Sequence, residues 1–188
     1  MEIKEYLTLV DKNDTPLGKQ EKIEIHKLGL LHRAFSIFIF NSNQELLLQQ
    51  RADVKYHSAG LWTNTCCSHP RFGEELLDAA NRRLFEEMGL KTNLEFAFSF
   101  IYKAEFENGL TEYEYDHVFW GQTDELPVTN ETEVKDWKYM SLHELKKDIN
   151  DNPAHYSEWI KLSLTRLVEQ LESLQIVDKN IYNLSQYA

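Results

Sequence analysis

Apolar positions along the chain predict an alternation of short strands with a few helices. Stretches rich in β-branched, leucine and aromatic residues, bounded by polar turns, predict strands. They lie near residues 7–10, 35–40, 46–50, 96–104, 113–121 and 137–140. The second and third of these flank the polar turn 41–45, so the pattern predicts that they form a β-hairpin.

Two longer segments repeat apolar residues at helical spacing, which predicts helices with one buried face. In the first, roughly residues 74–88, the buried stripe is expected to consist of Leu77, Ala80, Leu84 and Met88. At 100° per residue, Arg83 and Glu87 lie side by side on one flank of that stripe, whereas Arg82 and Glu86 point elsewhere. Arg83 and Glu87 are therefore expected to face a common pocket.

The C-terminal part of the chain predicts a second long helix at about residues 157–177. Its buried face is expected to carry Ile160, Leu164, Leu167, Leu171 and Leu174. Residues 141–145 look like the capped start of a further helix, and residues 178–188 form a polar tail. Because no repeat, linker or low-complexity segment interrupts the chain, residues 1–188 are expected to form one domain.

Charge and composition limit the classes of partner. The chain of 188 residues carries a formal net charge of -11, which repels nucleic acid and anionic membranes. An anionic substrate would therefore need a local cluster of cations. The longest apolar run, residues 35–40, is too short to cross a bilayer, and the N-terminus lacks the features of a signal peptide. We expect a cytoplasmic protein in which the adjacent Cys66 and Cys67 are free thiols.

The segment 63–70 contains the strongest candidate chemistry. In an extended conformation, residues two apart point to the same face, so the Cys67 thiol and the His69 imidazole can reach one pocket. Asn64 and Ser68 are expected to support the turn. An isolated pair of this kind would more often be a buried cysteine beside a surface histidine, so the flanking sequence decides between the two interpretations.

Glu112 and Glu114 are separated by one residue in a predicted strand, so both carboxylates point to the same side of the sheet. Two like charges in that position require a cation. With His26, His32 and His69, the set would contain three imidazoles and two carboxylates, which suits Mn²⁺ or Zn²⁺ better than Ca²⁺. The remaining histidines are expected to be surface or satisfied core residues: His57, His117, His143 and His155.

Residues 74–89 resemble the Nudix box, a loop-helix-loop whose glutamates hold divalent cations against a diphosphate. The residues that fit this motif are Glu74, Arg82, Glu86, Glu87 and Gly89. Ser68 replaces the usual opening glycine, and Arg83 replaces a glutamate that a hydrolase of this kind would use in its metal cluster. The departure weakens hydrolysis in particular and leaves diphosphate binding intact.

Together with residues 63–70, the box is similar to that of the type I isopentenyl-diphosphate isomerases, which are Nudix-fold enzymes of isoprenoid synthesis. The resemblance extends from about residue 22 to residue 159 and includes residues 32–35, 50–55 and 112–119. It implies an α+β fold: a Nudix-type α/β/α sandwich around a mixed β-sheet, with a core at about residues 30–145 and additional N- and C-terminal elements.

The resemblance also implies a reaction, the interconversion of isopentenyl and dimethylallyl diphosphate. An unactivated alkene is a very weak base, so an acid in a dry pocket must protonate it, and an opposed base must then remove a proton from the tertiary carbocation. Cys67 and Glu114 match the family's pair, in an order that stays open, and Tyr102 matches a partner in proton delivery. Trp159 matches an aromatic ring that faces the cation.

The implied binding residues fall into three groups. One tightly bound Mn²⁺ or Zn²⁺ would be held by His26, His32, His69, Glu112 and Glu114. A Mg²⁺ that accompanies the diphosphate would be held by Glu87 and the backbone carbonyl of Cys67. The substrate would be contacted by Lys22, Arg51, Lys55, Ser68 and Arg83.

Two other functions compete with this one. A Nudix hydrolase of a nucleoside or other diphosphate would keep Glu86 and Glu87 but would have no use for Cys67 together with Glu114. A metal- or ligand-binding module without activity would be expected to lack one of Cys67, Glu87 and Glu114, and all are present. The sequence leaves open whether the chain is a monomer or a homodimer.

Overall fold

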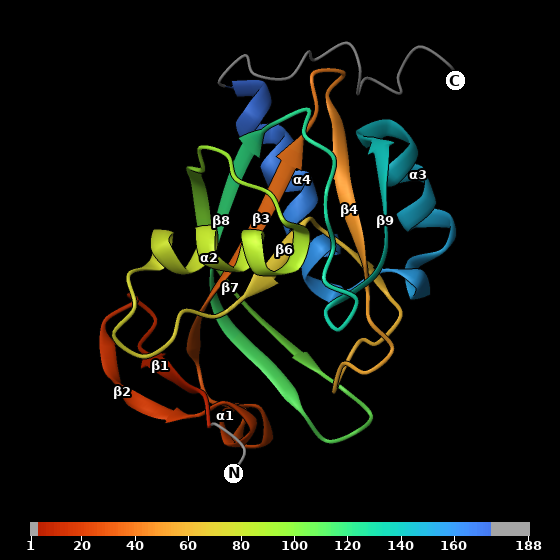
Figure 1. Cartoon of the computed structure of the whole chain (residues 1–188). Coiled ribbons are helices and arrows are strands. Elements are labelled where there is room, and N and C mark those ends of the chain that lie inside the picture. The colour runs from red at the N-terminus through yellow and green to blue at the C-terminus, as the bar shows by residue number, and fades with distance from the viewer. Residues whose placement is uncertain (1–3, 174–188) are drawn as a thin grey trace.

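The structure is a computed structural model that describes residues 4–173 of the chain (Figure 1). Its strands are β1 (Tyr6–Val10), β2 (Pro16–Glu21), β3 (His32–Phe40), β4 (Glu45–Arg51), β5 (Trp62–Thr63), β6 (Cys66–Ser68), β7 (Glu95–Glu105), β8 (Thr111–Gln122) and β9 (Val134–Ser141). Its helices are α1 (Lys22–Leu28), α2 (Leu76–Met88), α3 (Leu142–Asp151) and α4 (Glu158–Ser173), with a 3-10 turn at Pro153–His155. All predicted strands are present.

Strand β3 lies at the centre of a mixed sheet. It pairs in parallel with β8 over its whole length, from His32 opposite Glu114 to Phe40 opposite Gln122. Its other edge pairs antiparallel with β6, where Ser36 lies opposite Cys67. Parallel neighbours need a long crossover, and here the chain from β4 to β7 supplies it. The pairing brings residues about 80 positions apart in sequence into direct contact.

The hairpin predicted for residues 34–50 is present only next to its turn. The turn forms, because Asn41 and Gln44 close it through backbone hydrogen bonds. However, β3 and β4 share a single register pair, Phe40 with Leu46, and then diverge. β4 pairs instead with β9 and β5. Both strands are buried on two faces, so long-range partners compete for their edges and override the local hairpin signal.

Helices cover both faces of the sheet, and alternate residues of β3 pack into the two hydrophobic cores on either side of it. Phe35, Ile37 and Ile39 pack in the cluster beneath α2. Phe38 and Phe40 point the other way, into a cluster with residues of α3 and α4. Figure 1 shows α2 in front of the sheet and α4 behind it. The expected α/β/α sandwich around a mixed sheet is thus confirmed.

Helix α2 begins at Leu76, two residues later than predicted, and ends at Met88, where Gly89 caps it with a left-handed φ of 69°. The predicted stripe holds for Ala80, Leu84 and Met88, which are buried. The prediction that Leu77 is buried is wrong, because its side chain is 46% exposed. Ala79 and Glu87 are buried in its place, so the covered face is rotated toward the strand that carries Cys67.

The segment before β3 adds a hairpin and a short helix that the strand pattern did not predict. β1 and β2 pair antiparallel, and α1 follows directly. Glu21 caps α1 by accepting hydrogen bonds from the backbone of Ile23 and Glu24, and Gly29 ends it at φ 59°. Because α1 has only seven residues, it shows no apolar period in the sequence. It contacts β8 and buries His26 against it.

The C-terminal elements follow the prediction where the structure describes them. Ser141 and Glu144 form a capping box at the start of α3. Ile160, Leu164, Leu167 and Leu171 form the buried face of α4, whereas Leu174 and the polar tail 178–188 lie outside the described residues. Across residues 4–173, no helix combines the length and apolarity needed to cross a membrane.

Candidate active site

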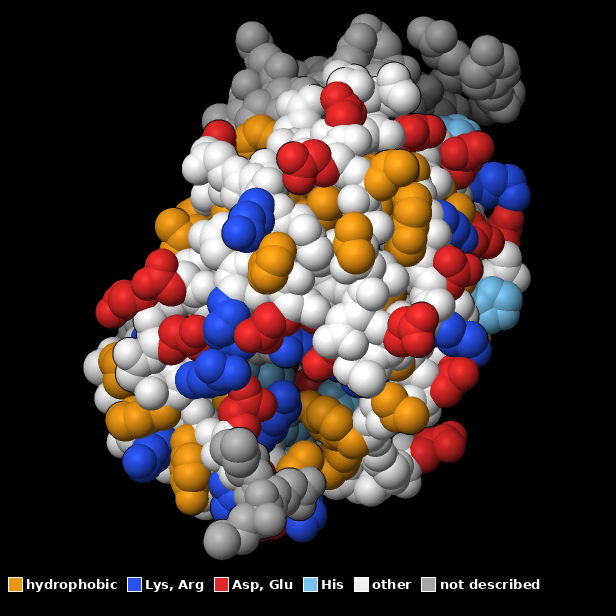
Figure 2. Space-filling model, in the orientation of Figure 1, with side chains coloured by type: hydrophobic (Ala, Val, Ile, Leu, Met, Phe, Trp, Pro, Cys, Tyr) orange, Lys and Arg blue, Asp and Glu red, His pale blue; other side chains and the backbone are white. Residues whose placement is uncertain are grey.

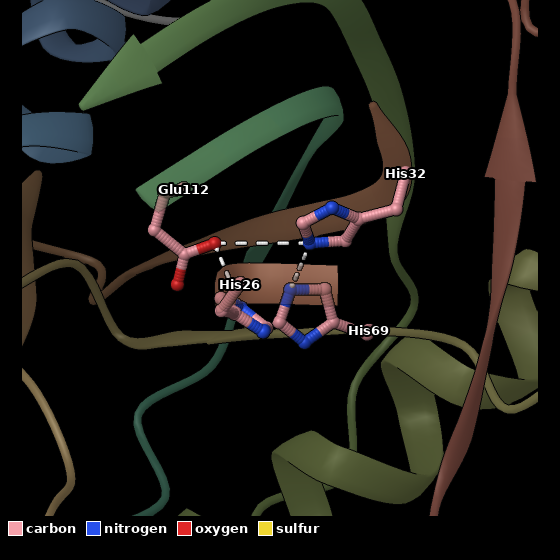
Figure 3. A group of neighbouring side chains, drawn as sticks. All are labelled: His26, His32, His69 and Glu112. Carbon is pink, nitrogen blue, oxygen red and sulfur yellow. Dashed lines mark hydrogen bonds and ion pairs between the residues drawn. The ribbon is translucent and has the colours of Figure 1, made fainter. Parts of the chain in front are cut away.

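A cluster of imidazoles and carboxylates lies where α1, β3, β6 and β8 meet. Ligand atoms of His26, His32, His69 and Glu112 all lie within 4.8 Å of one another, and all four side chains are buried. Figure 3 shows the rings and the carboxylate turned toward one point. Four separate segments contribute, so the cluster exists only because parallel pairing sets His32 beside β8.

Glu114 joins this cluster from the same face of β8. Its Oε1 lies 2.8 Å from Nε2 of His69 and 3.8 Å from Nε2 of His32. Glu112 and Glu114 are both buried, which follows from the alternation of a strand and agrees with the expected shared face. The predicted imidazole and carboxylate residues are thus brought together, His26 included.

The donor set fits a divalent cation. Nδ1 of His26 is 2.6 Å from the Lys22 carbonyl and Nδ1 of His32 is 2.8 Å from that of Leu30, so each Nδ1 donates and each Nε2 presents a lone pair. Nε2 of His26 and Oε2 of Glu112 are buried without a hydrogen-bond partner. Buried polar atoms without partners are costly, and an ion bound by them would remove that cost.

The protonation states of the cluster also fit a bound divalent cation. Burial lowers the pKa of His32 to about 4, so this ring is neutral at pH 7 and can act as a ligand. Burial, reinforced by the nearby charge of Glu112, raises the pKa of Glu114 well above its ordinary value. For Glu112, burial favours the neutral form, but the neighbouring imidazoles of His26 and His57 outweigh it and lower the pKa.

A pocket opens in front of this cluster, with about 470 Å³ of space that includes its solvent-facing mouth. Most predicted site residues line it: Lys22, Arg51, Lys55, Cys67, Ser68, His69, Arg83, Tyr102, Glu112, Glu114 and Trp159. His26 and His32 lie behind its wall. In the space-filling view, Lys and Arg side chains border a hollow in which histidines are visible, together with acidic and hydrophobic side chains (Figure 2). Cationic side chains and two members of the imidazole–carboxylate cluster, His69 and Glu112, therefore line one cavity.

The Cys67 thiol lies in this pocket, beside Arg51. Nη1 of Arg51 is 3.9 Å from the sulfur, and the guanidinium lies over the Trp159 ring, 5.2 Å from its centroid. Burial raises the pKa of Cys67 to about 12, so the thiol keeps its proton at neutral pH. Cys66 points into the core beneath α2, and both cysteines are free, as expected.

Tyr102 connects to the carboxylate side of the pocket. Its hydroxyl donates to Oε2 of Glu114 at 2.6 Å, across the β7–β8 pair that sets the two residues opposite each other. Burial and the charge of Glu114 raise the pKa of Tyr102 well above 10, so the phenol stays a donor. The backbone register alone brings this predicted pair into contact.

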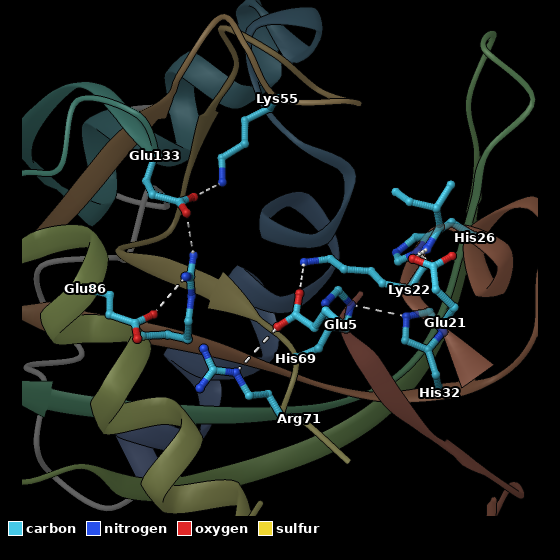
Figure 4. A network of polar contacts seen from close by, with 12 residues as sticks. Glu5, Glu21, Lys22, His26, His32, Lys55, His69, Arg71, Glu86 and Glu133 are labelled. Carbon is cyan, nitrogen blue, oxygen red and sulfur yellow. Dashed lines mark hydrogen bonds and ion pairs between the residues drawn. The ribbon is translucent and has the colours of Figure 1, made fainter. Parts of the chain in front are cut away.

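Three of the four cationic side chains of the pocket pair with carboxylates. Glu133 pairs with Lys55, and its Oε1 lies 3.2 Å from Nη2 of Arg83. Lys22 pairs with Glu5 at 2.9 Å. Figure 4 shows Glu133 beside Lys55 at one side of the network and Glu5 beside Lys22 near its centre. Anionic side chains thus occupy positions that an anionic ligand would contact.

Glu87 differs from the other predicted site residues. It is buried, it pairs with Arg83 as the helix spacing predicted, and it accepts a hydrogen bond from Gln49 at 2.9 Å. Among the residues that the structure describes, it does not line the pocket. Both of its oxygens are engaged by protein donors, so the structure does not bring it together with the other predicted ligands.

Two residues of the site were missed in the sequence. His57, expected to be a surface or satisfied core residue without a role in the site, is a buried pocket residue, and its Nε2 lies 2.7 Å from Oε1 of Glu112. Glu133 lies between two of the predicted substrate cations. Both come from segments outside regular strands and helices, where no periodicity indicates which way a side chain points. The one sequence feature that could have drawn attention to His57 is the aromatic residue beside it, Tyr56, which also lines the pocket.

Comparison with known proteins defines the class. The family model described as NUDIX domain matches residues 30–160. The crystal structure of DR0079 from Deinococcus radiodurans superposes with a TM-score of 0.71 at 17% identity, covering 88% of this chain and 99% of that one. The chain therefore belongs to the Nudix family, in agreement with its sandwich fold and the helix of its box.

Curated relatives narrow the assignment. The chain is 54% identical to isopentenyl-diphosphate Delta-isomerase 2 of Photorhabdus laumondii, over 88% of this chain and 94% of that protein. It is 47% identical to isopentenyl-diphosphate Delta-isomerase of Pectobacterium atrosepticum, over 90% and 94% of the two chains. Within the Nudix superfamily it is thus a member of the isopentenyl-diphosphate Delta-isomerase family.

Proposed function

We infer that the protein interconverts isopentenyl and dimethylallyl diphosphate by adding one proton and removing another. One pocket contains a thiol and a carboxylate that can exchange protons together with four cationic side chains, and it adjoins a buried cluster whose residues could hold a metal ion. This combination is the main support for the inference. The relatives named as isomerases support it at about half identity. Hydrolysis is not favoured, because Arg83 pairs with Glu87 where a hydrolase would have a further carboxylate.

Cys67 and Glu114 are the two proton carriers in this proposal. They lie on β6 and β8, which flank opposite edges of β3 and so approach the pocket from two sides. One of them gives a proton to the terminal methylene carbon of isopentenyl diphosphate and leaves a tertiary carbocation. The other takes a proton from the neighbouring CH₂ group, so the double bond moves and no atom is gained or lost.

Tyr102 holds Glu114 in place and passes protons to it through their hydrogen bond. When bound to His26, His32, His69, Glu112 and Glu114, an Mn²⁺ or Zn²⁺ ion would supply the positive charge that lets Glu114 ionise. Trp159 keeps water from the carbocation and offers it the face of an indole ring, worth roughly 2 kcal/mol when desolvated.

Lys22, Arg51, Lys55 and Arg83 bind the diphosphate, with Ser68 nearby in the same pocket. Because Glu133 already pairs with Lys55 and Arg83, the diphosphate must share or replace this carboxylate. Glu87 and the backbone carbonyl of Cys67 are proposed to hold a Mg²⁺ that arrives with the diphosphate. For Glu87 this requires release of one of its present donors, Arg83 or Gln49.

We further propose that residues 1–188 act as one catalytic domain in the cytoplasm, where Cys66 and Cys67 stay reduced. A proton NMR time course with isopentenyl diphosphate tests the reaction itself. The dimethylallyl isomer should appear without inorganic phosphate or diphosphate. Release of phosphate with no isomer would instead identify a hydrolase, and neither product would indicate a binding module.

A further inference from the structure

His57 makes a contact with the metal cluster that the mechanism above does not use. It lies in the segment between β4 and β5, yet its side chain is buried in the pocket. Its Nε2 is 2.7 Å from Oε1 of Glu112. The ring stacks on Phe106 with centroids 4.7 Å apart and planes 12° apart, so its orientation is fixed by packing.

The two oxygens of Glu112 face different partners. Oε2 lies 3.0 Å from Nε2 of His26 and 3.7 Å from Nε2 of His32, so it belongs to the cluster. Oε1 faces His57. His57 is therefore on the far side of the carboxylate, and it is absent from the group whose ligand atoms converge. The geometry makes it a partner of a ligand rather than a ligand.

The hydrogen bonds around His57 define which nitrogen carries the proton. His57 is outside the group whose ligand atoms converge, so its Nε2, 2.7 Å from a carboxylate oxygen, is assigned as a donor, and the neutral ring then has a bare Nδ1. That Nδ1 lies 3.3 Å from the Ser58 hydroxyl, which can donate to it. Arg51 donates to the His57 carbonyl at 3.2 Å, and Asn108 donates to the Tyr56 carbonyl at 2.8 Å. The loop is thus held from two sides with His57 pointing inward.

We propose that His57 is a positioning residue of the metal site, which makes Glu112 bind the ion through Oε2 alone. A carboxylate without this partner could rotate and offer either oxygen or both. The hydrogen bond from Nε2 keeps Oε1 away from the ion and fixes the direction of Oε2. This inference rests on the proposed metal site. Loss of such a partner of a metal ligand costs about 10- to 100-fold in metal affinity.

The test separates the donor from the ring. His57→Phe keeps an aromatic ring on Phe106 but cannot donate, whereas His57→Gln loses the ring but its amide NH₂ can reach the place of Nε2. His117→Phe is the control, because it removes another imidazole–carboxylate pair, Nε2 to Oδ2 of Asp14 at 3.1 Å, which is only partly buried and lies outside the cluster. Each protein is stripped of metal, and its affinity for Mn²⁺ and for Zn²⁺ is measured by competition with a chelator.

We expect His57→Phe to bind both ions about 10- to 100-fold more weakly, His57→Gln to stay within about threefold, and His117→Phe to match the unchanged protein. Equal affinity in His57→Phe and the unchanged protein would overturn the role of His57 and leave the metal site standing. If His57→Gln weakens binding as much as His57→Phe, with equal losses of melting temperature, ring packing rather than donation is responsible. Failure of the unchanged protein to bind either ion would refute the metal site itself.

Discussion

Tyr102→Phe is the smallest change that tests how Glu114 works. It removes one hydroxyl and no carbon, and the ring keeps its stack on Phe100, with centroids 5.6 Å apart. Oε2 of Glu114 then loses the donor that lies 2.6 Å away, while Oε1 keeps His69 at 2.8 Å. The change therefore acts on one hydrogen bond to a buried carboxylate.

The size of the effect follows from that bond. A hydrogen bond to a charged group contributes about 1.5 to 3 kcal/mol, which is about 10- to 150-fold in a rate that depends on it. We expect kcat to fall by this factor with little change in KM, because the hydroxyl contacts the carboxylate and none of the cations that we assign to the diphosphate.

The pH profile should move as well. The bond from Tyr102 favours the ionised form of Glu114, so its loss raises the pKa of this carboxyl further. Activity that requires the ionised carboxylate is lost as pH falls through that pKa, so the acid limb should shift to higher pH. Steady-state kinetics between pH 6 and 9, with metal content measured in each sample, provide the assay.

Tyr115→Phe is the control, because it removes a hydroxyl from the neighbouring odd position of β8, where the phenol contacts Ser99 and not Glu114. It should leave both kcat and the pH profile unchanged. A Tyr102→Phe enzyme within twofold of the unchanged protein, with the same acid limb, would refute the reasoning about Glu114.

Three further changes test other parts of the site. Cys67→Ala should abolish isomerisation while Cys66→Ala keeps most of it, since only the Cys67 thiol lines the pocket. The reverse result would show that Cys66, and not Cys67, is the proton carrier. Trp159→Phe should keep part of the turnover and Trp159→Leu should lose considerably more; equal turnover per folded molecule would remove the electrostatic role of the ring. Burial raises the pKa of Asp116 to about 7, so the folded state binds a proton that the unfolded state releases near pH 4, and stability falls as pH rises between these values. In chelator, Asp116→Asn should flatten this part of the melting curve against pH, and an unchanged slope would contradict it.

Local patterns in the sequence were reliable where one element alone fixes the geometry. Glu112 and Glu114 share a face because strand residues alternate, and Arg83 meets Glu87 because helix residues four apart are neighbours. The capping box at Ser141 follows from two residues three positions apart. Each of these contacts depends on a few consecutive residues and on no distant partner.

Contacts that depend on long-range pairing could not be predicted from such patterns. The turn after β3 indicated a hairpin, but parallel pairing with β8 decides the fold and sets His32 beside Glu114. Leu77 fits a helical stripe, yet the sheet covers the other flank of α2 and leaves Leu77 exposed. His57 reaches Glu112 only because its loop folds back over the sheet. The predicted ligand set came from the family resemblance, since segments this far apart have no common period.

Deuterium labelling during turnover tests the central claim, that Cys67 and Glu114 add one proton and remove another in one pocket. The enzyme converts isopentenyl diphosphate in D₂O, and ²H and ¹H NMR locate the label. Because both carriers exchange with solvent between turnovers, the account predicts deuterium in a methyl group of dimethylallyl diphosphate. The label should be absent when Cys67→Ala or Glu114→Gln is used with a full complement of metal. Isomerisation without any deuterium in the product would contradict this mechanism, because the hydrogen would then move within the substrate without visiting either side chain.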